Sequence, residues 1–79
     1  MEIEVKLFGN MGHYLPEGAD RFSFKRSLDE GATVQDLLKE LKIPETMPVL
    51  AMISGQRVEP TYALKDRDDV ALFSPAAGG

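Results

Sequence analysis

The segment from Thr33 to Pro44 carries a clear helical pattern, and it limits the fold more than any other feature of the sequence. Its apolar side chains recur at i, i+3, i+4 and i+7, as one stripe along a helix, at Val34, Leu37, Leu38 and Leu41. Thr33 is a suitable N-cap, and Asp36 stands three residues later, where a capping box needs an acceptor. Proline cannot continue a helix, so the pattern ends before Pro44. A lone helix of this kind has to bury its stripe against a sheet.

Alternation of apolar and polar residues predicts strands on both sides of this helix. The segment 2–8 alternates apolar with charged residues, and 21–28 repeats the pattern with Phe22, Phe24 and Leu28 on the apolar face. After the helix, further strands are expected over 49–53, 56–58 and 70–73.

The order of these elements gives the fold class. Strand, strand, helix, strand, short strand and strand, with a loop over 9–20, predict an α+β domain in which the helix covers one face of the sheet. A helical crossover between strands favours a mixed sheet over a plain meander. This is a β-grasp arrangement of about four to five strands. We expect it to span residues 1–74, with 75–79 as a flexible C-terminal tail.

Length and composition narrow the class of protein further. A chain of 79 residues has room for one domain. The absence of cysteine and the presence of one histidine exclude a disulfide framework, a Cys/His zinc site and a thiol nucleophile. A formal net charge of −4 disfavours nucleic-acid binding. The sequence has neither a signal-peptide pattern nor an apolar run of membrane-spanning length, so we expect a soluble, cytoplasmic protein with no membrane partner.

The polar residues that could carry chemistry have simpler interpretations. His13, in the 9–20 loop, has no second type of metal ligand beside it and is interpreted as an ordinary loop residue. Asp66, Asp68 and Asp69 lack the glycine and the distal glutamate of an EF-hand loop, and are interpreted as a solvated turn. No metal site is therefore predicted.

The C-terminal end is the remaining candidate for function. It finishes in Gly78 and Gly79, a backbone without side chains that is slim enough to enter a narrow channel and flexible enough to reach a remote active site. Because it follows a predicted strand, its anchor would be rigid. A frayed and inert end is the alternative, since two glycines alone are weak evidence.

Four segments form a combined pattern over nearly the whole chain: Val5-Lys6-Leu7-Phe8, Gly31-Ala32-Thr33-Val34 leading into Leu37-Leu38, Leu64-x-Asp66-x-Asp68-Asp69-Val70, and Leu72-Phe73-Ser74-Pro75-Ala76-Ala77-Gly78-Gly79. With these segments the chain resembles the ubiquitin-like sulfur carriers, which include the small subunit of molybdopterin synthase (MoaD) and the thiamine-pathway carrier ThiS. Pro75, three residues before Gly78, is more similar to the molybdopterin branch.

The resemblance implies a cosubstrate rather than an enzyme. In this family an E1-like adenylating enzyme of the MoeB/ThiF type uses ATP and Mg to adenylate the terminal carboxylate, here that of Gly79, and a sulfur donor converts it to a thiocarboxylate. The chain itself would bind no cofactor. In the molybdopterin branch Gly79 would enter the active site of the large synthase subunit, and Gly78, which has no side chain, would leave room beside it. The expected partner contacts are Phe73, Pro75, Ala76 and Ala77.

Alternatives stay open at this point. The chain could be a protein modifier, joined through Gly79 to a lysine amine of a target, or a sulfur carrier of the thiamine pathway. It could also be a β-grasp interaction domain with an inert tail. For Phe73, ordinary strand packing is as good an interpretation as partner contact.

Overall fold

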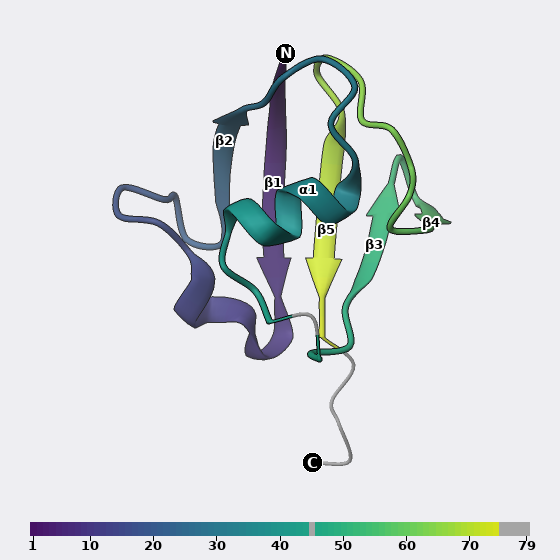
Figure 1. Ribbon diagram of the computed structural model, residues 1–79. Coiled ribbons are helices and arrows are strands. Elements are labelled where there is room, and N and C mark those ends of the chain that lie inside the picture. The colour runs from purple at the N-terminus through teal and green to yellow at the C-terminus, as the bar shows by residue number, and fades with distance from the viewer. Residues whose placement is uncertain (45, 75–79) are drawn as a thin grey trace.

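One α-helix lies across one face of a mixed sheet in the computed structural model of the protein, which describes residues 1–44 and 46–74, with the backbone alone at positions 10, 12 and 13 (Figure 1). The elements are β1 (Glu2–Phe8), the 3-10 helix η1 (Gly9–Tyr14), β2 (Ser23–Ser27), α1 (Val34–Glu40), β3 (Leu50–Ile53), β4 (Gln56–Val58) and β5 (Asp69–Phe73). This confirms the predicted α+β, β-grasp class. Within the described part of the chain, no helix has the length and apolarity needed to span a bilayer.

The last strand in the sequence lies in the middle of the sheet. The strand order is β2-β1-β5-β3-β4, so β5 separates the two hairpin-like pairs. It runs parallel to β1, with Val5 opposite Val70 and Leu7 opposite Leu72, and antiparallel to β3. The first and last strands of the chain are therefore direct neighbours.

The hydrophobic core lies between α1 and the inner face of the sheet. Alternate residues of the strands point to one face, and this face meets the stripe of the helix. The buried apolar side chains are Ile3, Val5, Leu7, Met11, Val34, Leu37, Leu41, Ile43, Ala51, Ile53, Leu64, Val70 and Leu72. The predicted stripe is confirmed at Val34, Leu37 and Leu41, whereas Leu38 is half-buried at its border.

The first turn of α1 has the predicted capping box. The Thr33 amide donates to Oδ2 of Asp36 at 2.9 Å, and the Asp36 amide donates to Oγ1 of Thr33 at 3.2 Å. Hydrogen bonds to a carboxylate favour its ionised form, so those from the Thr33 backbone and side chain lower the pKa of Asp36 below its ordinary 3.8.

The remaining amides at this helix end are taken up by a distant loop. The Val34 amide donates to the Tyr62 carbonyl at 3.0 Å, and the Gln35 amide donates to the Pro60 carbonyl at 2.9 Å. Helix N-terminal amides lack partners within their own helix, so these bonds satisfy them and fix α1 to the loop that leads into β5.

At the C-terminal end of α1, a lysine stands at the position where glycine is usual. The Ile43 amide donates to the Leu38 carbonyl and the Lys42 amide to the Lys39 carbonyl, both at 3.0 Å, which is the bonding of a Schellman motif. Lys42 has φ of 62°, a left-handed conformation that glycine adopts most easily.

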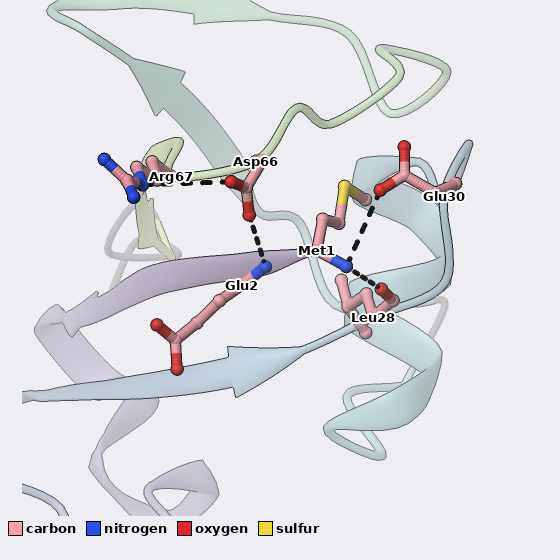
Figure 2. A network of polar contacts seen from close by, with 6 residues as sticks. All are labelled: Met1, Glu2, Leu28, Glu30, Asp66 and Arg67. Carbon is pink, nitrogen blue, oxygen red and sulfur yellow. Dashed lines mark hydrogen bonds and ion pairs between the residues drawn. The ribbon is translucent and has the colours of Figure 1, made fainter.

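The start of β1 is held from both sides, as Figure 2 shows. The Met1 ammonium group donates to the Leu28 carbonyl at 2.9 Å, beside β2. On the other side the Glu2 amide donates to Oδ1 of Asp66 at 2.8 Å, and the Arg67 amide donates to the Glu2 carbonyl at 2.6 Å. The turn before β5 is therefore fastened to the first strand.

Two sequence predictions are corrected by the structure. The second strand is shorter than 21–28 because Arg21, with φ of 56°, turns the chain just before Ser23. Phe22 consequently lies in the turn and is 40% exposed, where we expected a core position. The 9–20 loop is partly regular, since Gly9–Tyr14 forms η1 and buries Met11 completely.

Candidate functional site

The predicted functional tail follows β5. Phe73, the last residue of this strand, is described by the structure. The other residues predicted to act lie outside the described residues: Pro75, Ala76, Ala77, Gly78 and Gly79. The site is therefore characterised by its anchor and by the surface around that anchor.

The anchor is rigidly placed. Phe8 and Leu50 flank Phe73 in register on the two neighbouring strands, so the end of β5 is paired on both sides. Beyond it, the Ser74 carbonyl lies against Gly9, where an added Cβ would be 3.3 Å from the carbonyl oxygen. Gly9 has φ of 68°, so both the backbone conformation and the close approach call for glycine. The backbone at Ser74 therefore leaves little room for a side chain at position 9.

Three aromatic rings gather beside this exit, on the face of the sheet opposite α1. The ring of Phe8 lies 4.9 Å from that of Phe22 and 6.3 Å from that of Phe73, the second pair in an edge-to-face arrangement. Phe8 and Phe22, at 38% and 40% exposure, are the exposed large hydrophobic residues of the described chain. We call Phe8, Phe22 and Phe73 the aromatic cluster.

The same outer face continues away from the exit as a shallow hollow of about 260 Å³. It is lined by Lys6, Phe8, Met52, Ser54, Gly55, Asp69 and Ala71. Nζ of Lys6 lies 3.4 Å from Oδ2 of Asp69, and both side chains are partly exposed, so this ion pair adds little stability. The outer face is thus apolar near the exit and charged farther from it.

Sequence reasoning included Phe73 in the site but missed the other two rings. The sequence did contain an indication for Phe8. Side chains alternate along a strand, and Phe8 falls on the same side as Glu2, Glu4 and Lys6, which is the solvent side of β1. Phe22 gave no such signal, because its position depends on the turn at Arg21. Phe73 is half-buried and combines strand packing with a place in the aromatic cluster.

The acidic turn is used within the fold. Asp66 accepts the Glu2 amide, Asp68 accepts the Lys65 amide at 2.9 Å, and Asp69 pairs with Lys6. Among the described residues, no group of three or more histidine, cysteine or acidic side chains is arranged to hold a metal ion. The side chain of His13 lies outside the described residues.

Comparison with known proteins places these features in context. The sequence model of the ThiS family matches residues 5–79. No protein of curated function matches the sequence. SAMP1 from Haloferax volcanii has a similar structure, with a TM-score of 0.73, 22% identity and coverage of 100% of both chains.

Two further solved structures carry a different description. The putative molybdopterin converting factor, subunit 1, from Pyrococcus furiosus has a TM-score of 0.73 and 26% identity over 95% of this chain and 98% of that one. A complex of subunits 1 and 2 of the molybdopterin-converting factor from Helicobacter pylori 26695 matches with a TM-score of 0.64 and 20% identity over 100% of both chains.

Proposed function

Because the chain belongs to the ThiS family, we propose that it is a ubiquitin-like sulfur carrier that receives sulfur on the Gly79 carboxylate and donates it as a thiocarboxylate. The observation that carries the proposal is the exit from β5. This strand is paired on both sides, the chain leaves it beside an exposed aromatic cluster, and the family match continues to residue 79. A rigid anchor followed by a slim terminus suits delivery of a reactive group into another protein.

The chemistry requires activation of the carboxyl group. A carboxylate resists attack by a sulfur nucleophile because it is negatively charged and oxide is a poor leaving group. Reaction of the Gly79 carboxylate with ATP and Mg, in an E1-like adenylating enzyme of the MoeB/ThiF type, gives an acyl-adenylate and releases pyrophosphate. A sulfur donor then forms the C–S bond as AMP leaves. Gly78 and Gly79 add no side-chain bulk at the reacting carbon.

We assign the carrier to the molybdopterin branch. The support is the likeness to the Pyrococcus furiosus protein described as subunit 1 of a molybdopterin converting factor, at 26% identity. Its acceptor would be the large subunit of molybdopterin synthase, with Pro75, Ala76 and Ala77 leading Gly79 into that active site. The Helicobacter pylori complex of subunits 1 and 2 is the precedent for such an assembly.

Conjugation to proteins is the second candidate function. It is favoured by the structural likeness to the small archaeal modifier protein 1 of Haloferax volcanii. A modifier would use the same adenylation at Gly79 but pass the acyl group to a lysine amine, and higher-mass conjugates would accumulate in the host. A pure sulfur carrier would form none.

The decisive experiment is intact-mass measurement after incubation with ATP, Mg, a sulfide source and an E1-like enzyme. We expect a mass gain equal to replacement of one oxygen by sulfur. The gain should be lost when Gly79 is deleted and kept when an exposed residue far from the exit is changed, as in Arg57→Ala. If several competent activating enzymes yield neither an adenylate nor the mass gain, the tail is inert and the proposal is wrong.

The aromatic cluster provides a second test. Phe22→Ala removes an exposed ring and leaves the core intact, so we expect its free energy of unfolding to change by less than about 1 kcal/mol. Contact of the cluster with a partner predicts about tenfold weaker binding to the activating enzyme, as for an interface aromatic residue. Isothermal titration measures the affinity and urea denaturation the free energy of unfolding, with Arg57→Ala as the control in both. Equal affinity of wild type and Phe22→Ala would exclude the cluster from the interface.

A further inference from the structure

The strand β2 lies at one edge of the sheet, and its hydrogen-bonding pattern shows which backbone groups are left open (Figure 1). The Leu7 amide donates to the Phe22 carbonyl, and Met1 and Leu28 exchange both of their backbone bonds. Residues of an antiparallel pair alternate between facing the partner strand and facing away from it. Lys25 and Ser27 therefore direct their amides and carbonyls away from β1, toward the free edge.

One part of this edge is already closed by the protein itself. Ser23 also faces outward, and it exchanges two backbone hydrogen bonds of 2.8 Å with Asp20 across the turn at Arg21 and Phe22. The outward-facing backbone amides and carbonyls of Lys25 and Ser27 have no hydrogen-bond partner among the residues that the structure describes. Unpaired groups on an edge strand are a template for a further strand.

Two clefts follow this open edge and meet at Ser27. One, of about 590 Å³, runs along β2 beside the 16–20 loop, and the other, of about 460 Å³, lies between the end of β2 and α1. Four acidic residues line the second cleft: Asp29, Glu30, Asp36 and Glu40. Two of these carboxylates have a cationic partner: Glu40 lies 3.5 Å from Arg26, and Glu30 lies 3.7 Å from the Met1 ammonium group. Because the other two have no such partner among the described residues, the far end of the open edge carries a net negative charge.

We propose that the free edge of β2 binds an extended, basic segment of a partner protein as an added strand. The backbone of that segment would pair with Lys25 and Ser27, and its Lys or Arg side chains would lie in the acidic cleft. A second copy of this chain fits poorly, because edge-to-edge pairing would bring two such acidic clefts together. The acidic cleft lies at the other end of β2 from Phe22 and the aromatic cluster, so the carrier could be held there while its tail enters another protein.

The test uses a capped hexapeptide that alternates lysine with valine as the probe, added to the full chain and followed by amide NMR. We expect the largest shifts at the Lys25 and Ser27 amides, slower hydrogen exchange of both, and weaker binding at higher salt. A peptide with glutamate in place of lysine should show no saturable binding.

Ser27 offers a matched pair of variants. Proline at an outward-facing edge position removes only the outward amide and leaves the pairing with β1 intact, so Ser27→Pro should fold and bind the lysine peptide about tenfold more weakly. Ser27→Ala loses the hydroxyl group, keeps the amide and should bind as the wild type does. The double variant Asp29→Asn, Glu30→Gln should bind about fivefold more weakly and with less dependence on salt.

Three results would overturn the proposal. The first is the absence of saturable shifts at Lys25 and Ser27, and the second is equal binding of the glutamate peptide. The third is a chain that dimerises through this edge, seen by light scattering and abolished in Ser27→Pro. Deletion of residues 75–79 should leave peptide binding unchanged, so failure here and failure of the sulfur-carrier function are distinguishable.

Discussion

At the scale of single residues, the backbone just before the proposed functional tail packs against a glycine far from it in sequence. Gly9 sits at the end of β1 in a left-handed conformation, against the carbonyl of Ser74. It thus sets the path of the backbone just before the tail. We therefore expect Gly9, which has no chemistry of its own, to affect how the tail is presented to an activating enzyme.

Gly9→Ala should destabilise the protein and impair activation of the tail together. We expect a loss of about 1–2 kcal/mol in the free energy of unfolding, because alanine is strained at this φ and its Cβ presses on the Ser74 carbonyl. Gly18→Ala is the matched control, since Gly18 has φ of 83° but open space around its Cβ position. Both variants should unfold earlier in denaturant, but only Gly9→Ala should slow thiocarboxylate formation. Equal rates of thiocarboxylate formation in the two variants would show that the contact with Ser74 has no effect on activation.

Lys42 is a second residue whose backbone conformation costs stability. It occupies the position after α1 where glycine is usual, so Lys42→Gly should raise the free energy of unfolding by about 0.5–1 kcal/mol. Lys42→Ala removes the same charge and keeps the strain, and should be neutral. Urea denaturation measures both variants, and a destabilised Lys42→Gly would contradict the prediction.

At the scale of elements, prediction from sequence succeeded where the determinants are local. Thr33, Asp36 and the stripe from Val34 to Leu41 lie within three turns of one another, and the structure confirms the cap and the buried face. The burial of Met11 could not be predicted in this way, since it needs η1 to pack under the ends of β1 and β5. Phe22 was misplaced because the turn at Arg21 reverses the expected parity.

The capping box gives α1 a specific dependence on pH. The pKa of Asp36 is lower in the folded protein, so the stability it adds is fully present above its unfolded value, near 3.8, and is lost as pH falls through the lower folded value. Asp36→Ala should be less stable than wild type at neutral pH, and the difference should narrow below pH 3.8. Thermal unfolding over this range, with Asp29→Ala as the control, measures the effect. A constant difference between wild type and Asp36→Ala would rule out the charge as its source.

At the scale of the whole molecule, we expect fold and function to be divided between the sheet domain and the tail. The buried apolar side chains of the described residues run from Ile3 to Leu72, so the core that they form ends within β5. The domain boundary predicted at residue 74 stays a prediction. The sequence predicted the terminal site through Gly78 and Gly79, but the aromatic cluster beside it depends on three segments that meet only in the folded sheet.

A chain that stops after Ser74 tests this division. Its free energy of unfolding should lie within about 0.5 kcal/mol of that of the full chain, as for changes away from the core. It should also be inert to the activating enzyme, as judged by intact mass. A truncated chain that fails to fold would place residues 75–79 within the domain.

The position of β5 also bears on how the protein is made. The pair β1 and β2 and the pair β3 and β4 are joined in the sheet only through β5, which is the last strand to be synthesised. Pairing between distant parts of a chain has to wait until both are available. During synthesis the two pairs would therefore stay unconnected until β5 has emerged from the ribosome, and until then β1 and β3 would each keep an open edge.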